Sequence, residues 1–334
     1  MKHILFLTTG GTIASSSSGE GLAPTLSGEE ILKYMPELDE LCEFDTEQVM
    51  NIDSSNMQPE DWISIARRIY DRISFYDGVV ITHGTDTMAY TSSMLGFMLR
   101  GLDRPVILTG AQIPIHNYGS DARKNLRDSF LTASAEGLFG VYVVFNGKII
   151  NGTRAFKMST EDRDAYVSRN HPYAGHVANY SVEIHARKQP SSLALTLQSD
   201  ICHDIFLLKL IPGTRPEILT LIVEMGYKGI VIETFGAGGL PYFRRNLLTE
   251  VERVINMGIP VVLLTQCPYD GTHLEVYDIG VKAEQAGVIS GKDMTTEAAV
   301  TKLMWVLGQT HDPIAIKEFM HRNICGEIAG SAQV

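Results

Sequence analysis

The sequence predicts an α/β fold of two domains, in which mostly parallel sheets are flanked by helices. Short apolar runs rich in β-branched residues alternate with stretches of helical periodicity, which is the pattern of parallel sheets. The chain has 334 residues, a length that favours two domains over one compact domain. Hydrophobic residues make up 44% of the chain and charged residues 20%, as in ordinary globular proteins.

Six apolar runs are expected to form buried strands of these sheets: Ile4–Leu7, Val79–Ile81, Val106–Leu108, Val141–Phe145, Ile230–Ile232 and Val261–Leu264. A threonine follows five of the six runs, either at once or after one residue: Thr8, Thr82, Thr109, Thr234 and Thr265. Ligands of open α/β sheets bind at the carboxyl ends of the strands. We therefore expect these hydroxyl groups to line one sheet edge.

Two helices are expected to cover the sheets. The first begins at Pro59, because Pro59, Glu60 and Asp61 suit the first turn of a helix. Its apolar stripe, which should face the sheet, consists of residues at helical spacing: Ile63, Ala66, Ile69, Tyr70 and Ile73. The second helix runs from Thr295 to Leu307 and is expected to cover the sheet of the second domain.

The expected domain organisation is an N-terminal catalytic domain of residues 1–187, a linker of residues 188–204 and a smaller C-terminal α/β domain of residues 205–334. The junction lies near the polar stretch Arg187–Ser192, which contains a proline. Another stretch, Ser15–Gly21, is rich in serine and glycine. It is expected to be either a mobile lid over a ligand site or a plain exposed loop.

Composition excludes several classes of protein. The formal net charge of −11 would repel a polyphosphate, and no basic patch offsets it, so nucleic acid is not an expected partner. The four cysteines are scattered and the histidines lack metal-ligand spacing, so no metal site or disulfide framework is expected, although a single disulfide stays open. With no signal-peptide pattern and no apolar stretch of roughly 18 residues, we expect a soluble cytoplasmic protein without a membrane segment.

Two glycine-rich segments, Thr8–Ala14 and His83–Met88, carry the strongest functional signal. Each follows an expected buried strand and places small hydroxyl side chains on a tight turn. A threonine hydroxyl is a weak nucleophile unless a neighbouring group removes its proton, and glycines let backbone amides approach a ligand as an oxyanion hole requires. Since Asp86 could bind an ammonium group or orient a lysine, the pattern favours acyl transfer by a hydroxyl group over cofactor binding.

Taken one at a time, these residues also have ordinary structural explanations. A single threonine is more often a turn or cap residue than a nucleophile, and Ser54 and Ser55 would suit the cap of the first helix. His83 is either a general base or a participant in a structural hydrogen bond. The Gly10–Gly11 pair lacks the further glycines and the lysine of phosphate-binding loops.

Five segments, in matching order and spacing, carry a resemblance to a known family: Thr9–Ala14, Asp53–Met57, Val80–Thr87, Thr109–Gln112 and Arg154–Lys157. Thr265–Cys267 and Ala286–Val288 extend the match into the C-terminal half. On these motifs the chain resembles the bacterial-type L-asparaginase family, and particularly its cytoplasmic type I members.

This resemblance implies an enzyme without a cofactor that hydrolyses the side-chain amide of L-asparagine to L-aspartate and ammonia. Four residues match the family's catalytic positions: Thr12, Thr85, Asp86 and Lys157. Five residues match positions that bind substrate: Ser54, Ser55, Asp86, Gly84 and Ala111. In the family pattern Thr12 is the primary nucleophile, Thr85 belongs to a threonine-lysine-aspartate triad, and the backbone amides of both threonines stabilise the oxyanion. Which of the two threonines makes the first attack stays open. Asp86 would take the α-ammonium group of the substrate and Ser54 its α-carboxylate.

Several positions depart from the family pattern or conflict with it. Relatives usually carry a lid tyrosine where Gly21–Pro24 has Leu22, and leucine cannot relay a proton. Either another group such as Tyr34 takes this role or the reaction is impaired. Phe156 replaces a threonine that some type I enzymes use at a regulatory site, so no allosteric response of that kind is expected. Phe235–Gly239 also lacks an asparagine that many relatives carry.

Two rival functions stay open. Amidotransferase subunits that supply ammonia for tRNA-linked glutamate amidation resemble this chain but carry an additional N-terminal domain, which is not expected here because the first motif begins at Thr8. A non-catalytic amino-acid sensor would keep the pocket without turnover, as Leu22 suggests. The preference for asparagine or glutamine, possibly with some activity on both, depends on about one methylene of pocket depth. By resemblance, the protein is expected to form a homodimer or a homotetramer.

Overall fold

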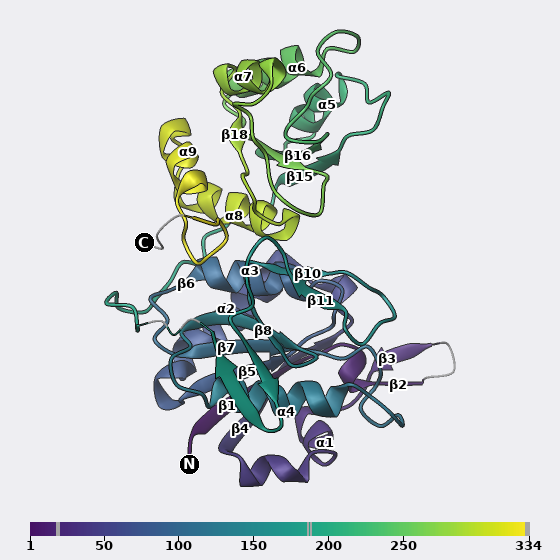
Figure 1. The fold of residues 1–334 in the computed structure, drawn as a ribbon, viewed down its shortest axis with the longest axis vertical. Coiled ribbons are helices and arrows are strands. Elements are labelled where there is room, and N and C mark those ends of the chain that lie inside the picture. Colours follow the sequence, from purple (N-terminus) through teal and green to yellow (C-terminus); the bar gives the residue numbers. More distant parts are fainter. Residues whose placement is uncertain (18–20, 186, 188, 331–334) are drawn as a thin grey trace. The chain divides into compact units, whose positions relative to one another are not determined.

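The structure, a computed structural model, describes residues 1–17, 21–185, 187 and 189–330. The chain divides into two compact units, Met1–Ser199 and Asp200–Val334, and each contains a mostly parallel sheet flanked by helices (Figure 1). The predicted α/β fold class is confirmed. The expected linker, residues 188–204, contains β14 (Thr196–Leu197), which pairs with β6 (Leu99–Arg100) of the first unit.

The first unit is built on a sheet of eight strands. In spatial order these are β13 (Ser181–Ile184), β12 (Gly175–Ala178), β9 (Lys148–Asn151), β8 (Gly140–Phe145), β7 (Pro105–Thr109), β5 (Gly78–Thr82), β1 (His3–Gly10) and β4 (Glu43–Ile52). The five strands from β8 to β4 are parallel, and β9, β12 and β13 add antiparallel pairs at one end. The carboxyl ends of the parallel strands therefore meet at one edge.

Helices cover both faces of this sheet (Figure 1). On one face lie α1 (Gly28–Leu32) and α4 (Ala122–Ala133), and on the other lie α2 (Pro59–Arg72) and α3 (Met88–Met98). The described part of this unit also contains the 3-10 turns η1 (Thr12–Ala14), η2 (Pro36–Glu40), η3 (Ser54–Asn56) and η4 (Ile73–Phe75). No helix in the described part of the chain has the length and apolar character that a membrane crossing requires.

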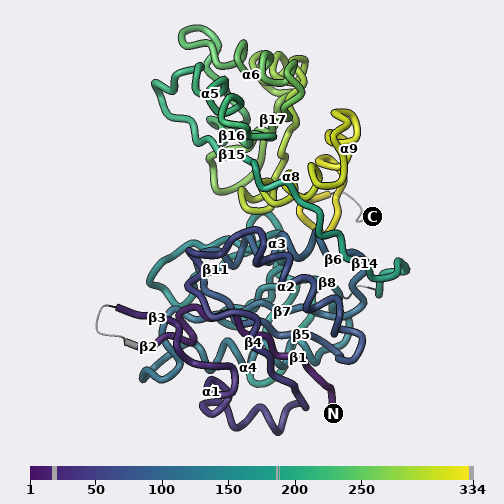
Figure 2. Tube along the Cα trace, turned by 180° about the vertical axis from the view of Figure 1, so that it is seen from behind, coloured from purple at the N-terminus to yellow at the C-terminus, as the bar shows by residue number. Residues whose placement is uncertain are grey.

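Two short antiparallel hairpins complete the first unit. Strands β10 (Ala155–Lys157) and β11 (Tyr166–Ser168) pair with each other, as do β2 (Ser15–Ser17) and β3 (Leu22–Pro24). Figure 2 shows β2 and β3 extending away from the large sheet. The stretch expected as a lid or loop, Ser15–Gly21, thus begins in strand β2, and its residues 18–20 lie outside the described residues.

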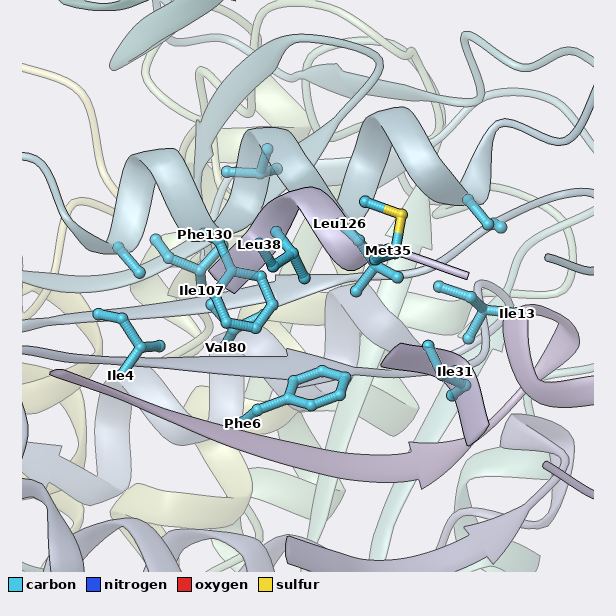
Figure 3. Close-up of a cluster of buried hydrophobic side chains, with 14 of the residues drawn as sticks. Ile4, Phe6, Ile13, Ile31, Met35, Leu38, Val80, Ile107, Leu126 and Phe130 are labelled. Atoms are coloured by element: carbon cyan, nitrogen blue, oxygen red, sulfur yellow. The ribbon is translucent and has the colours of Figure 1, made fainter. Parts of the chain in front are cut away.

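A hydrophobic core joins the sheet to α1 and α4 (Figure 3). Strand residues Ile4, Phe6, Val80 and Ile107 pack in one cluster with Phe130 of α4. Alternate residues of a strand face opposite sides, which is why every second residue of β1 points into this cluster. Ile13, in the turn after β1, is also fully buried in it. Burying such a side chain contributes about 1.5–3 kcal/mol, so the turn that carries Thr12 is tied to the core.

The first predicted helix is α2, and it begins at Pro59 as expected. Its buried face consists of Trp62, Ile65, Ala66 and Ile69. The predicted apolar stripe is wrong at Tyr70, which is 39% exposed. The stripe runs through Trp62 instead, because the indole donates a hydrogen bond to the Thr91 hydroxyl of α3 (2.9 Å) and so satisfies its polar edge while buried.

The second unit contains a parallel sheet in the order β15 (Ile205–Lys209), β16 (Gly229–Thr234), β17 (Val261–Thr265) and β18 (Ile289–Ser290). Its helices are α5 (Ile218–Glu224), α6 (Leu247–Asn256), α7 (Asp278–Gln285), α8 (Thr296–Gln309) and α9 (Pro313–His321). The second predicted helix is α8, capped by the Thr295 hydroxyl. A fully buried ion pair between Lys302 and Glu327 (2.6 Å) ties the segment after α9 to α8.

The expectation of a single hydroxyl-lined edge is wrong. Thr8, Thr82 and Thr109 are register neighbours on β1, β5 and β7 of the large sheet, whereas Thr234 and Thr265 pair with each other in the small sheet. All five are buried. Each still lies within its strand, so the residues that follow the strands form the sheet edge.

Candidate functional site

The turn after β1 depends on two glycines in left-handed conformations. Gly10 has φ 97° and Gly11 has φ 80°, values that side chains with a Cβ strongly disfavour. A Cβ added to Gly11 would lie 2.5 Å from the Cα atom of Gly84. The first glycine-rich segment therefore packs with its backbone directly on the second.

Two further glycines let neighbouring loops pack closely against the segment that contains Gly84. A Cβ on Gly84 would lie 2.5 Å from the Ser54 hydroxyl oxygen, and a Cβ on Gly110 would collide with the carbonyl oxygen of His83. The loops after β1, β4, β5 and β7 thus converge at the carboxyl edge of the large sheet. This is the position at which open α/β sheets bind ligands.

Three of the four predicted catalytic residues form one hydrogen-bonded group. The Nζ atom of Lys157, at the end of β10, donates to Thr85 Oγ1 (2.7 Å) and to Asp86 Oδ1 (2.6 Å). Thr85 is buried, and the Lys157 side chain is only 16% exposed, whereas the Asp86 side chain is 62% exposed. The group thus presents a carboxylate to solvent and keeps its hydroxyl and amine sheltered.

The hydroxyl of Thr85 has a second partner, Gln112. Thr85 Oγ1 donates to Gln112 Oε1 (3.1 Å) while it accepts from Lys157 Nζ. In this arrangement the hydroxyl proton is directed to Gln112. For Lys157 to take that proton, the ammonium must first lose one of its own and the hydroxyl must rotate. The hydrogen bonds therefore show the group before any transfer of the Thr85 proton to Lys157.

Thr12 opens the η1 turn, directly after Gly11, but its hydroxyl makes no hydrogen bond to any described residue. The structure thus brings Thr12 to the same edge as Thr85 through the contact between Gly11 and Gly84, without a bond between the two side chains. Within the described residues, neither the Thr12 nor the Thr85 backbone N–H donates to a protein acceptor. Two backbone donors are left available to a ligand.

The predicted serine pair divides between buried and exposed positions. Ser54 is buried, and its carbonyl accepts a bond from the Thr87 hydroxyl (2.8 Å). Ser55 is exposed and donates its amide (2.8 Å) and hydroxyl to Asp53 Oδ1. The Ser55 hydroxyl and amide, together with the charge of Lys157, hold the pKa of Asp53 below its usual range. Neither serine caps α2, whose N-cap residue is Gln58.

Ala111 is buried, and two polar residues hold the loop that contains it: Asp121, the N-cap residue of α4, and Asn125 within α4. Asp121 accepts bonds from the amides of Gln112 (2.9 Å) and Ile113 (3.0 Å). Asn125 donates to the carbonyl of Gly110 (3.0 Å). Sequence reasoning gave Asp121, Asn125 and Gln112 no place in the site, although Gln112 ends one of the motifs that carry the family resemblance.

His83 is a structural residue in this site. It is fully buried, with Nδ1 2.7 Å from the Gly84 carbonyl and Nε2 2.9 Å from the Thr91 hydroxyl, which itself accepts from Trp62. This pattern assigns the Nδ1–H tautomer. Burial lowers the pKa of His83 to about 4, so the ring is neutral near pH 7. With both nitrogens engaged and no exposed surface, it is not placed to act as a general base.

The three residues considered with the departures lie on separate segments of the first unit. Leu22 is 57% exposed on β3, opposite Ser17. The ring of Tyr34 packs against the core beside α1, with the Arg123 guanidinium 5.9 Å from its centroid. Phe156 lies on β10 with the Arg169 guanidinium 5.3 Å from its ring centroid. Within the described residues, Tyr34 makes no hydrogen bond to Thr12 that would let it replace the missing relay.

Residues 1–17, 21–185, 187 and 189–330 contain no group of three or more histidine, cysteine or acidic side chains arranged to hold a metal ion.

Two family models match the chain and together span most of it. Residues 3–190 match the N-terminal asparaginase domain, and residues 204–320 match the glutaminase/asparaginase C-terminal domain. These matches place the converging loops entirely within the N-terminal family domain.

Individual relatives agree with the family models. The L-asparaginase of Thermococcus kodakarensis is 42% identical over 329 residues, covering 98% of this chain and 99% of its own. Its solved structure matches with a TM-score of 0.94, at 41% identity and over 98% of this chain and 100% of that one. L-asparaginase I from Vibrio cholerae matches with a TM-score of 0.88, at 32% identity and over 98% and 99% of the two chains.

A differently named relative belongs to the same group of sequences. A glutamyl-tRNA(Gln) amidotransferase subunit of Methanobrevibacter smithii is 36% identical over 339 residues, which cover 98% of this chain and 77% of that protein. Both family domains and full-length asparaginases match this chain. It therefore belongs to the asparaginase family of hydrolytic enzymes.

Proposed function

We propose that this protein hydrolyses the side-chain amide of L-asparagine to L-aspartate and ammonia through an acyl-enzyme formed on a threonine. The observation that carries the proposal is the hydrogen-bonded group of Thr85, Lys157 and Asp86. It places a candidate base, Lys157, with an orienting carboxylate and a sheltered hydroxyl at the sheet edge where Thr12 also lies, and a threonine nucleophile requires such a base. Membership of the asparaginase family supports the same reaction.

Thr12 is the proposed nucleophile. Its hydroxyl oxygen attacks the amide carbon, the hydroxyl proton is transferred to the departing nitrogen, and ammonia leaves an ester on Thr12. Water then cleaves the ester, releasing L-aspartate and restoring the hydroxyl. The unpaired N–H groups of Thr12 and Thr85 supply two donors for the developing oxyanion, and each such donor typically contributes a factor of about 10² to 10³ to the rate.

The substrate would be held by charge and by close backbone approach. The exposed carboxylate of Asp86 suits the α-ammonium group, and Ser54 suits the α-carboxylate. Ser55, Gly84 and Ala111 are proposed to line the remaining space. The Asp53 carboxylate, whose ionised form Ser55 stabilises, adds negative charge beside Lys157, which favours a substrate with an ammonium group over one without it.

An asparagine-binding sensor is the second candidate. Leu22 stands where relatives carry a relay tyrosine, and the Thr12 hydroxyl has no hydrogen-bond partner in the described structure that would activate it. Such a protein would bind asparagine tightly and release no ammonia. A third candidate, an ammonia-supplying amidotransferase subunit, is favoured by the 36% identity to the amidotransferase protein of Methanobrevibacter smithii.

Ammonia release from L-asparagine and L-glutamine by the purified protein tests these alternatives. We expect release from asparagine, with a lower rate from glutamine if the pocket excludes one methylene, a difference of about 1–3 kcal/mol in transition-state binding. No release from either amide, with asparagine still raising the melting temperature, would identify the sensor. Release that requires a partner protein would identify the amidotransferase subunit.

We further propose that the protein works in the cytoplasm as a homodimer or homotetramer, without nucleic acid, metal or cofactor. Light scattering of the purified protein measures the mass of the assembly. Activity that a chelator leaves unchanged would agree with a reaction that needs no metal.

A further inference from the structure

Two residues that pair with each other in the β10–β11 hairpin both contact Thr85. Lys157 and Tyr166 are registered partners in this antiparallel pair. Lys157 Nζ donates to the Thr85 hydroxyl (2.7 Å), and the Tyr166 hydroxyl donates to the Thr85 backbone carbonyl. This one residue pair therefore bonds to both the side chain and the main chain of Thr85.

The hydroxyl of Tyr166 is not needed to fill the core. Tyr166 is fully buried, with its ring 5.2 Å from that of Phe145 on β8, and a phenylalanine would occupy nearly the same volume. A buried hydroxyl costs free energy unless it is hydrogen-bonded. Here its acceptor, the Thr85 carbonyl, lies 81 residues earlier in the chain, in the second glycine-rich segment.

The segment between β10 and β11 also holds the other partner of Thr85. Gln112 Nε2 donates to the carbonyls of Ser159 and Asp162, each at 3.3 Å, while its Oε1 accepts from Thr85. The hairpin is itself anchored to β9 by an ion pair between Lys148 and Asp164 (2.6 Å). These contacts to the Thr85 hydroxyl and carbonyl therefore come either from the hairpin or from Gln112, which the hairpin holds.

From these contacts we propose that Tyr166 is a positioning residue that fixes the peptide unit between Thr85 and Asp86 against Lys157. The peptide unit is planar, so a bond to its carbonyl restrains the orientation of both residues. Thr85 Oγ1 and Asp86 Oδ1 must both reach Lys157 Nζ, and that alignment requires one orientation of the peptide. This inference rests on the proposed function, because it gives Tyr166 a part in the same reaction.

The variant Tyr166→Phe removes the hydroxyl and keeps the ring. Loss of alignment at the reacting group should lower kcat by about 10- to 100-fold. The Asp86 carboxylate keeps its ion pair with Lys157, so KM should change by less than about threefold. A hydroxyl that served only the stability of the core would lower the melting temperature and leave kcat unchanged.

Tyr142 offers a matched control in the same unit. It is buried on β8, and its hydroxyl donates to the backbone carbonyl of Phe139 (3.1 Å), away from the site. Tyr142→Phe should lower the melting temperature to a similar extent and leave kcat as in the wild type. Equal kcat values for the two variants, beside an active wild type, would overturn the role of Tyr166 alone. A wild type that releases no ammonia would overturn the proposed function and this inference together.

A second pair of variants applies even if Tyr166→Phe does not fold. Replacing Tyr166 by 4-aminophenylalanine keeps a hydrogen-bond donor on the ring, whereas 4-fluorophenylalanine fills nearly the same volume without a donor. We expect kcat near the wild-type value for the first variant and a loss like that of Tyr166→Phe for the second. Equal kcat values for these two variants would contradict the proposal.

Discussion

Gly11 and Gly84 touch through their backbones: a Cβ placed on Gly11 would lie 2.5 Å from the Cα atom of Gly84. Each of these glycines directly precedes one of the two candidate catalytic threonines. The contact therefore sets the separation of Thr12 and Thr85, although their side chains share no hydrogen bond. It also explains why two segments more than seventy residues apart in sequence both carry glycine at this point.

Gly11→Ala should abolish this approach. The new methyl group would collide with Gly84 and would require alanine at φ 80°, at a combined cost of about 2–3 kcal/mol in folding stability. Ammonia release should fall by about 100-fold, because the two threonines are forced apart. Gly140→Ala is the control: Gly140 also has a positive φ, but its Cβ would meet nothing within 4 Å. Equal losses of activity in the two variants would show that the contact has no special role.

Lys157→Met should remove most of the activity and little of the stability. Methionine keeps the apolar stem but supplies no amine for proton transfer, a role worth about 10² to 10⁴ in rate. The ion pair with the exposed Asp86 contributes at most about 1 kcal/mol to folding. Lys282→Met, which breaks a 2.6 Å pair with Asp278 on α7, controls for the loss of a lysine. Turnover of the Lys157 variant near the wild-type rate would exclude Lys157 from the reaction.

Thr82→Val should leave folding stability unchanged or raise it by about 1 kcal/mol, because the buried Thr82 hydroxyl has no hydrogen-bond partner in the described structure. Its register neighbour Thr109 donates to the Val144 carbonyl (2.8 Å), so Thr109→Val should lower stability by about 1 kcal/mol. Urea unfolding of both variants measures the difference. A marked loss in Thr82→Val would instead reveal an ordered water bound to that hydroxyl.

Acidification should destabilise the protein through His83. Burial lowers its pKa to about 4 from 6.5, so the native state binds fewer protons than the unfolded state between these values. The stabilisation is present above about pH 6.5 and is lost as the pH falls through 4, by about 3 kcal/mol in all. The free energy of unfolding of His83→Gln should therefore depend less on pH over this interval than that of the wild type. An equal pH dependence of His83→Gln and the wild type would contradict this role of His83.

The strands at the centre of both sheets were predictable because they are buried on both faces. β5, β7, β16 and β17 are short, almost continuous apolar runs, which parallel strands between two helix layers require. The edge strand β4 was not predicted, because its sequence mixes charged and apolar residues along a partly exposed surface. The strands of the first unit after β8 have two to four residues each, too few to show a period.

The candidate site was predictable only where its residues sit in compact motifs. Thr12 and Thr85 follow glycines at strand ends, a pattern visible in the sequence, and resemblance added Lys157. Tyr166 carries no such signal, because it acts on a backbone carbonyl of a residue distant in sequence. Gln112 ended one of the family motifs, yet its bond to Thr85 became apparent only when the loops after β5 and β7 were placed together.

The role proposed for the threonine hydroxyls is catalysis of L-asparagine hydrolysis. Its most direct test is the rate of ammonia release by the wild type, Thr12→Ala and Thr85→Val, with Thr82→Val as a control for loss of a nearby threonine hydroxyl. We expect release by the wild type and Thr82→Val, and losses of several orders of magnitude in Thr12→Ala and Thr85→Val while their melting temperatures stay close to that of the wild type. Undiminished release by both Thr12→Ala and Thr85→Val would contradict it.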